Sequence, residues 1–210
     1  MGLFTGKTVI VTGGGKATLK DGSAGSIGYG IDIAFAKEGA NLVITGRNVA
    51  KLEAAKESLE AEYGVKVLPS RQTSLPVRTT GHCQHVVDEA IAAFGRIDAL
   101  VNNVPGLLAS GVNHRRPTPM ELVRPSHLLG TCTPPFLYMQ KCYPHLKETR
   151  GSVVNFASGA GLFGNFGQCS YAAAKEGVRG LTRVAANEWG PDWSSTSTSS
   201  ARLPGPRSSR

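Results

Sequence analysis

Tyr171 and Lys175 are four residues apart, so on a helix their side chains share one face. A neighbouring ammonium favours the phenolate and lowers the pKa of a tyrosine from about 10. Such a tyrosine can pass a proton to or from the oxygen of an alcohol or a ketone. Ser158 ends an apolar, strand-like run thirteen residues before Tyr171, where its hydroxyl can bind the same oxygen. These side chains predict acid/base chemistry at an alcohol or ketone, although the Tyr–Lys spacing alone is common on ordinary surface helices.

A glycine-rich turn near the N-terminus predicts a phosphate-binding loop. The apolar run 7–12 is typical of a buried parallel strand, and Gly13, Gly14 and Gly15 follow it. After a polar insert, the glycine-containing segment 25–28 leads into the helical pattern of residues 31–36. A strand, a glycine turn and a helix in this order place a pyrophosphate at the helix N-terminus, because glycine lets the backbone approach the phosphates.

The residues after the second predicted strand bear on the choice of cofactor. That strand covers residues 41–45 and is followed by Gly46 and Arg47. In dinucleotide-binding folds an acidic residue at this place binds the ribose 2′-hydroxyl. An arginine suits a 2′-phosphate instead, because its guanidinium can bind phosphate through two hydrogen bonds. We therefore expect NADP(H) to be preferred; the alternative is a solvated arginine at a strand end, with NAD(H) as the cofactor.

Strands and helices alternate along the chain, which predicts an α/β fold with a doubly wound, Rossmann-like parallel sheet. The further predicted elements are helix 50–63, strand 65–68, helix 86–94, strand 98–102, strand 152–157 and a final helix at about 168–189. We expect residues 1–193 to form a single dinucleotide-binding and catalytic domain.

Taken together, these motifs resemble the short-chain dehydrogenase/reductase family, over about residues 3–190. The resemblance implies that Ser158 polarises the substrate oxygen, that Tyr171 is the acid/base, and that Lys175 holds the nicotinamide ribose and lowers the pKa of Tyr171. A narrower resemblance, in residues 26–30, 36–41 and 157–164, is to bacterial hydroxysteroid dehydrogenases. The expected cofactor-binding residues are Thr12, Gly13, Gly14, Ser26, Ile27, Gly28, Arg47, Asn102, Asn103, Tyr171 and Lys175.

The 210 residues carry a formal net charge of +8, a property shared with many nucleic-acid-binding proteins. The excess charge lies in three segments, 71–85, 104–136 and 194–210, which hold eight Arg, no Lys and one acidic residue. These segments lack the periodicity of a helix or a strand. A basic binding module is therefore the least favoured interpretation, and we expect no nucleic-acid partner.

The cysteines and the apolar runs bear on location. Four cysteines show no metal-ligand spacing, so we expect free thiols, no metal and a reducing, cytoplasmic environment. No apolar run is long enough to span a membrane, and no signal peptide precedes the first strand. We therefore expect no membrane partner.

The same three segments depart from the family pattern. The acidic residue after the third strand, the residues that usually follow Asn103, and the helical asparagine of a catalytic tetrad have no counterpart; by position that asparagine would fall near His127 or Thr131. Residues 194–210 stand where the family has its last strands, and we expect a disordered tail there and few helices in the proline-rich segments. One interpretation is a disordered extension. The favoured one is a truncated chain with local shifts of the reading frame, because codons chosen for 71–80 and 194–210 encode family-like segments in another frame.

We expect an NADP(H)-dependent oxidoreductase that interconverts a secondary alcohol and a ketone, with a hydroxysteroid as the candidate substrate. The partner is a small-molecule alcohol or ketone, and an intact member of the family is expected to form a homo-oligomer. The departures from the family pattern predict weak turnover by this chain. The alternatives are a non-catalytic dinucleotide-binding protein and, last, a basic nucleic-acid-binding module.

Overall fold

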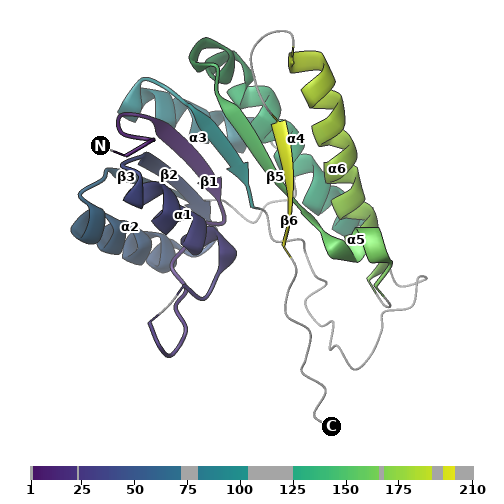
Figure 1. Cartoon of the computed structure of the whole chain (residues 1–210), viewed down its shortest axis with the longest axis horizontal. Helices are drawn as coiled ribbons and strands as arrows, with labels where there is room; N and C mark the ends of the chain where they lie inside the picture. Colours follow the sequence, from purple (N-terminus) through teal and green to yellow (C-terminus); the bar gives the residue numbers. More distant parts are fainter. Residues whose placement is uncertain are drawn as a thin grey trace.

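Six strands form one parallel sheet in the order β3-β2-β1-β4-β5-β6 in the computed structural model (Figure 1). The structure describes residues 2–22, 24–71, 80–103, 125–165, 168–190 and 196–201. The strands are β1 (Thr8–Thr12), β2 (Asn41–Gly46), β3 (Val67–Arg71), β4 (Ala99–Asn102), β5 (Ser152–Ser158) and β6 (Thr196–Ala201). The helices are α1 (Ile27–Lys37), α2 (Val49–Tyr63), α3 (Thr80–Phe94), α4 (Pro125–Thr149), α5 (Gly159–Phe163) and α6 (Cys169–Trp189). The predicted doubly wound α/β fold is confirmed.

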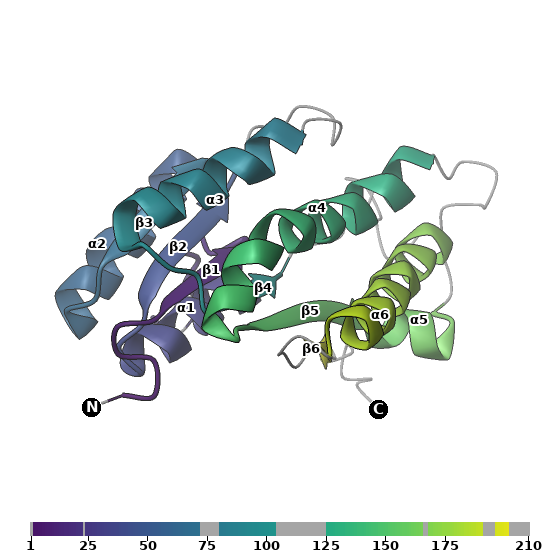
Figure 2. The same cartoon turned by 90° about the horizontal axis from the view of Figure 1, so that it is seen from above.

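Helices cover both faces of the sheet, and alternate residues of β1 belong to different cores. Val9 and Val11 of β1 pack with residues of α1 and α2, whereas Ile10 packs with residues of α3, α4 and α6. On the second face α3 and α4 lie side by side (Figure 2). This burial on both faces explains why the centres of β1 and β2 are continuous apolar runs rather than alternating ones.

Side-chain caps start the two helices that follow β1 and β2. The Ser26 hydroxyl accepts a hydrogen bond from the Tyr29 amide at the start of α1, and the Asn48 side chain accepts one from the Lys51 amide at the start of α2. Such caps satisfy amide donors that have no partner within the helix. Gly64 ends α2 in the left-handed conformation, at φ 66°, which glycine adopts without strain. Both helix N-termini therefore lie beside the carboxyl ends of the strands that precede them.

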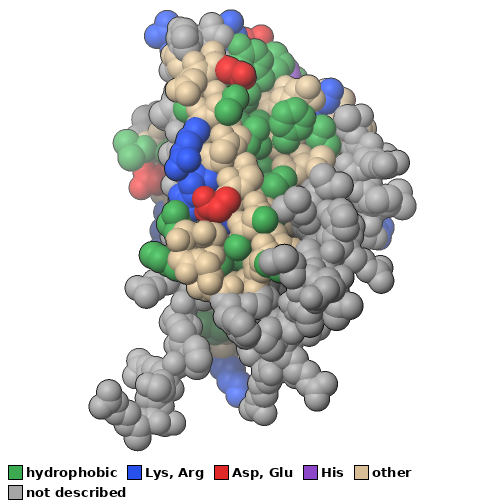
Figure 3. All heavy atoms as spheres, turned by 90° about the vertical axis from the view of Figure 1, so that its right-hand side faces the viewer, with side chains coloured by type: hydrophobic (Ala, Val, Ile, Leu, Met, Phe, Trp, Pro, Cys, Tyr) green, Lys and Arg blue, Asp and Glu red, His purple; other side chains and the backbone are tan. Residues whose placement is uncertain are grey.

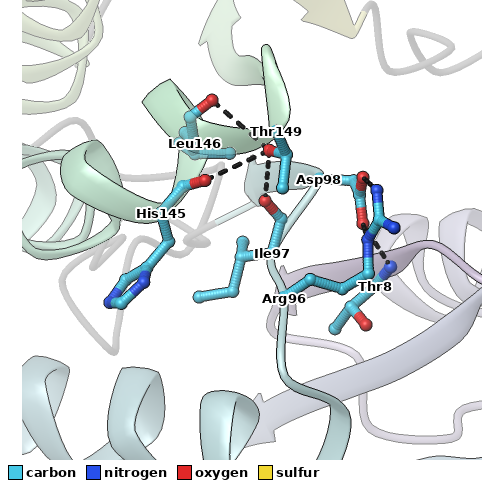
Figure 4. A network of polar contacts seen from close by, with 7 residues as sticks. All are labelled: Thr8, Arg96, Ile97, Asp98, His145, Leu146 and Thr149. Carbon is cyan, nitrogen blue, oxygen red and sulfur yellow. Dashed lines mark hydrogen bonds and ion pairs between the residues drawn. The ribbon is translucent and has the colours of Figure 1, made fainter.

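A polar network joins β1, β4 and α4 at the amino ends of the strands, opposite their carboxyl ends (Figure 4). The Asp98 carboxylate accepts a hydrogen bond from the Thr8 amide at 2.9 Å and is paired with the Arg96 guanidinium at 2.6 Å. Nearby, the Thr149 hydroxyl donates to the Ile97 carbonyl at 2.7 Å. The network ties the starts of β1 and β4 to the end of α4, far along the strands from their carboxyl ends.

The last described segment differs from the disorder expected for 194–210. Residues Thr196–Ala201 pair in parallel with β5, from Val153 opposite Thr196 to Ser158 opposite Ala201. The outer edge of β5 offers a row of backbone donors and acceptors, which pair with a neighbouring strand whatever its side chains. Threonine also favours extended backbone. Residues 202–210 lie outside the described residues, as do 72–79 and 104–124.

Helix α4 corrects a second expectation, that prolines prevent regular helices in the segment 104–136. Residues from Pro125 onward are helical, and Pro134, Pro135 and Pro144 lie inside the helix. A proline in a helix removes one backbone hydrogen bond. Packing of α4 against α3, α6, β4 and β5 offsets that loss. Helix α3 likewise begins six residues before the predicted helix 86–94.

Candidate active site

The predicted site residues come together along one edge of the sheet. Thr12, Asn102 and Ser158 are the last residues of β1, β4 and β5, and parallel pairing places these ends beside one another. In open α/β sheets this carboxyl edge is where ligands bind. Helix α6, which carries Tyr171 and Lys175, packs against β5. The structure therefore gathers the residues that the sequence separates by more than 160 positions.

Lys175 is held in a buried setting beside Tyr171. Its side chain is 5% exposed, its ammonium donates to the Phe156 carbonyl at 2.8 Å, and it lies 5.9 Å from the centre of the Tyr171 ring. Burial lowers the pKa of Lys175 to about 8, because the charged form loses solvation. The ammonium thus lies over the Tyr171 ring, at the four-residue spacing that brings two side chains onto one face of a helix.

Ser158 lies between β5 and α5 with its side chain buried. Its hydroxyl oxygen accepts a hydrogen bond from the Ala160 amide at 3.2 Å, which caps α5. A hydroxyl that accepts one bond through oxygen keeps its own O–H to donate. The cap therefore fixes the oxygen and leaves a donor for a substrate oxygen.

Cys132 of α4 contacts α6 one residue before Lys175. The sequence analysis missed this contact. Its thiol donates to the Ala174 carbonyl at 3.0 Å, and burial raises the pKa of the thiol. A Cβ on Gly177 would lie 2.8 Å from the sulfur, so the two helices cross closely because residue 177 has no side chain. The register of this crossing cannot be found in a local motif, least of all in a segment where no helix was expected.

The glycine turn after β1 is built for close backbone approach. The Gly13 and Gly14 amides donate to the Thr45 carbonyl at 2.8 and 3.1 Å, and Gly13 has a φ of 77°. A Cβ on Gly28 would collide with the Gly13 carbonyl, so only glycine fits at the start of α1. The helix begins there with Ser26 and Ile27, which place its first amides at the turn. This cradle fits the pyrophosphate of a dinucleotide.

Two asparagines extend the cradle toward β5. The Asn103 side-chain amide donates to the Thr12 carbonyl at 3.2 Å, and the Asn102 amide donates to the Asn155 side-chain oxygen at 2.8 Å. The side-chain oxygen of Asn102 is buried without a hydrogen-bond partner among the described residues. A buried acceptor in this state suits a ligand that donates, such as a ribose hydroxyl. Asn155 is a further residue that the sequence analysis missed.

Arg47 is exposed directly after β2. Its neighbour Gly46 packs against Leu52, so that a Cβ there would lie 3.2 Å from the leucine methyl group. An acidic side chain at 46 would have to displace Leu52. Arg71, at the end of β3, pairs with Gly46 in the sheet. The strand register thus adds a second arginine to this corner, which the sequence analysis missed because register is set by long-range pairing.

The fold and the arrangement of these side chains define an oxidoreductase of the nicotinamide-dependent class. The family model described as short chain dehydrogenase matches residues 7–193, and the chain belongs to that family. A 12alpha-hydroxysteroid dehydrogenase of a Clostridium species is 55% identical over 197 residues, which is 91% of this chain and 71% of that protein. An NADP-dependent mannitol dehydrogenase of Aureobasidium melanogenum is 37% identical over 183 residues, 83% of this chain and 65% of that protein.

Solved structures agree with the family assignment. A short-chain dehydrogenase/reductase from Burkholderia xenovorans superposes with a TM-score of 0.77 and 27% identity, and the match covers 96% of this chain and 76% of that one. Within the described residues, no group of three His, Cys, Asp or Glu side chains is placed to hold a metal ion. No helix of the described part is long and apolar enough to cross a membrane.

Proposed function

We propose that this chain interconverts a secondary alcohol and a ketone with NADP(H), and that its substrate is a hydroxysteroid. The observation that carries the proposal is that Ser158 ends β5 at the carboxyl end of the sheet, while Lys175, which lies over the Tyr171 ring on α6, donates to the Phe156 carbonyl of the same strand. The 55% identity to a hydroxysteroid dehydrogenase supports the substrate class.

In the direction of ketone reduction, two side chains act on the substrate oxygen and a third supports one of them. The Ser158 hydroxyl donates a hydrogen bond to the carbonyl oxygen and polarises it. The Tyr171 hydroxyl delivers the proton as the oxygen becomes an alkoxide, and the Lys175 ammonium stabilises the phenolate that remains. When bound, the reduced nicotinamide supplies a hydride to the carbonyl carbon. In alcohol oxidation the same phenolate accepts the proton.

An apolar surface next to Ser158 supports an apolar substrate. Leu162 and Phe163 in α5 are 55% and 77% exposed, and α5 begins at the residue after Ser158. Large apolar side chains exposed on a helix that begins directly after Ser158 favour contact with an apolar ligand. A steroid offers apolar rings for that contact and a hydroxyl or ketone for Tyr171.

The first experiment measures NADPH oxidation with steroid ketones, from the absorbance of the nicotinamide. We expect weak turnover by the unmodified chain, because it departs from the family pattern, with NADPH preferred to NADH. No NADPH oxidation with any steroid or simple ketone, together with no nicotinamide binding, would refute the proposed function. Binding without turnover would favour the non-catalytic alternative.

Arg47 tests the choice of cofactor. In Arg47→Asp we expect the preference to shift from NADPH to NADH by at least about tenfold in Kd, because a carboxylate repels the 2′-phosphate and accepts a bond from a 2′-hydroxyl. Lys66→Asp, at an exposed position directly before β3, changes the charge equally and serves as the matched control. Equal binding of both nucleotides by the unmodified chain would count against the role of Arg47.

A further inference from the structure

A buried chain of hydrogen bonds joins the cofactor edge of the sheet to the helix of Tyr171 and Lys175. The Asn102 amide donates to the Asn155 side-chain oxygen at 2.8 Å, and the Asn155 amide donates to the Thr182 hydroxyl at 2.9 Å. That hydroxyl donates to the Val178 carbonyl at 2.7 Å. All three polar side chains are buried. One polar path therefore crosses β4, β5 and α6 inside an otherwise apolar core.

Each end of this path lies on an element that also carries a residue of the proposed reaction or of the proposed cofactor site. Asn102 precedes Asn103, whose amide bonds to the end of β1 at the glycine turn. Thr182 follows Lys175 by seven residues, or about 10 Å along the helix. Lys175, Val178 and Thr182 are all buried and share the face of α6 that lies against β5.

Helix α6 is attached to two successive residues of β5. The Lys175 ammonium donates to the Phe156 carbonyl at 2.8 Å, and the Thr182 hydroxyl accepts from the Asn155 side chain. Apolar packing is non-directional and leaves small rotations of a helix open, whereas hydrogen bonds are directional. In the proposed function the ammonium also serves the cofactor ribose and the Tyr171 oxygen. The attachment at Thr182 involves no reacting group and stays in place when the ammonium changes partners.

We propose that Asn155 and Thr182 are positioning residues. Their hydrogen bond fixes α6 against β5, so that Tyr171 and Lys175 stay aligned with a cofactor at the carboxyl ends of β1 and β4. The proposal rests on the proposed function for its effect on rate. Its structural half, the placement of Lys175 by Thr182, does not.

Thr182→Val tests the proposal because valine keeps the shape and loses the hydroxyl. The Asn155 amide then keeps only the weak acceptor Met139 sulfur, at 3.4 Å. We expect kcat to fall about tenfold or more, since small misplacements of reacting groups are costly, while the Kd for NADPH stays within about twofold. Thr182→Ser keeps the hydroxyl and is expected to restore kcat to within about twofold of the unmodified chain.

Thr149→Val is the matched control. It removes a hydroxyl with a 2.7 Å hydrogen bond at the amino ends of the strands, and so measures the effect of a lost bond alone. We expect its kcat to be unchanged. An equal loss of kcat in Thr149→Val and Thr182→Val, or unchanged kcat in Thr182→Val, would overturn the positioning role.

A second measurement needs no turnover: the pH dependence of Lys175 acetylation, followed by mass spectrometry. Among the described residues, Cys132 and Tyr171 are the titratable groups that lie near the Lys175 ammonium. Burial holds the pKa of Lys175 near 8. We expect Thr182→Val to raise that pKa toward the ordinary 10.5, and Thr182→Ser and Thr149→Val to leave it unchanged. An unmodified chain with neither turnover nor nicotinamide binding refutes the proposed function, while this titration still decides the positioning role. Identical titration in all variants would refute it.

Discussion

The ammonium of Lys175 combines two properties that rarely occur together at the surface of a helix. It is buried, which lowers its pKa to about 8, and it still donates a hydrogen bond, to the Phe156 carbonyl. A lysine in this state is mostly charged at neutral pH and loses its charge at mildly alkaline pH. The positive charge of Lys175 is therefore present below about pH 8 and lost above it.

Tyr171→Phe isolates the proton transfer. We expect ketone reduction to fall by at least about a hundredfold, because the ring keeps its packing and the proton donor is lost, while NADPH binding changes little. Rates are compared from the absorbance of the nicotinamide, with binding followed by fluorescence. Tyr63→Phe removes an exposed hydroxyl on α2 and should leave both unchanged. Substantial turnover by Tyr171→Phe would remove Tyr171 from the acid/base role.

Asp32 is a residue whose replacement should stabilise the fold. It is fully buried in α1 beneath Gly14, neither carboxyl oxygen has a partner among the described residues, and burial raises its pKa well above the ordinary carboxyl value. Below the ordinary carboxyl pKa of about 4 the group is neutral in both states and carries no ionisation penalty. As the pH rises, only the unfolded state ionises freely, and the folded state loses stability.

We therefore expect Asp32→Ala to raise the free energy of unfolding by about 1–3 kcal/mol at pH 7 and by less below about pH 4. Urea unfolding at several pH values measures the difference. Asp98→Ala is the opposite case, because it removes a buried carboxylate that holds Arg96 and the Thr8 amide, and it should destabilise the fold. A loss of stability in Asp32→Ala across the whole pH range would contradict the expected sign.

At the scale of elements, α4 crosses α6 next to Lys175. Gly177 lies where the Cys132 sulfur of α4 reaches the Ala174 carbonyl of α6. Gly180, one turn further along α6, has open space where a Cβ would be. The two glycines share a helix and differ only in this contact, so they form a natural pair for measurement.

Gly180→Ala should raise the free energy of unfolding by about 0.5–1 kcal/mol, because alanine has the higher helix propensity. Gly177→Ala should lose that gain, because its methyl group would lie 2.8 Å from the Cys132 sulfur. Urea unfolding of both variants gives the difference, and Cys132→Ala in the Gly177→Ala background should restore the gain. Equal gains in the two single variants would mean that the helices do not cross closely at this point.

The elements differ in how far their sequence predicts them. The strands β1 and β2, the glycine turn and the helices α1, α2 and α6 follow from apolar periodicity, caps and glycines, all of which are local signals. Helix α4 could not be predicted, because three prolines oppose it locally and packing against four elements decides the outcome. The position of Ser158 at the end of a strand, and of Tyr171 and Lys175 on one face of a helix, could be predicted. The contacts of Cys132, Asn155 and Arg71 could not, because they depend on strand register and helix crossing.

At the scale of the whole molecule, one side carries apolar side chains that the described residues leave uncovered. Figure 3 shows hydrophobic side chains gathered among charged ones on the side of α6. Phe136 on α4 and Val184 on α6 are about half exposed, and the two helices pack together. An apolar surface of this kind favours association with a second copy, in line with the expected homo-oligomer.

We expect Val184→Glu to shift the chain toward monomers, because a carboxylate at a self-contact loses its solvation in the assembly. Light scattering after size-exclusion chromatography, at several concentrations, measures the mass. Val49→Glu changes an equally exposed valine on α2, on the other face of the sheet, and should leave the mass unchanged. A monomeric unmodified chain would contradict the expected assembly.

The strand order has a consequence for synthesis on the ribosome. The chain emerges from its N-terminus, so β1, β2 and β3 are available first and can form half of the sheet with α1 and α2. In that half β1 is an edge strand, and its free edge stays unpaired until β4 is available, which begins 28 residues after the end of β3. During this interval the nascent chain exposes an unpaired edge that carries Ile10, a residue of the buried core. Chaperone binding to the nascent chain should therefore peak after β3 has left the exit tunnel and decline once β4 has emerged.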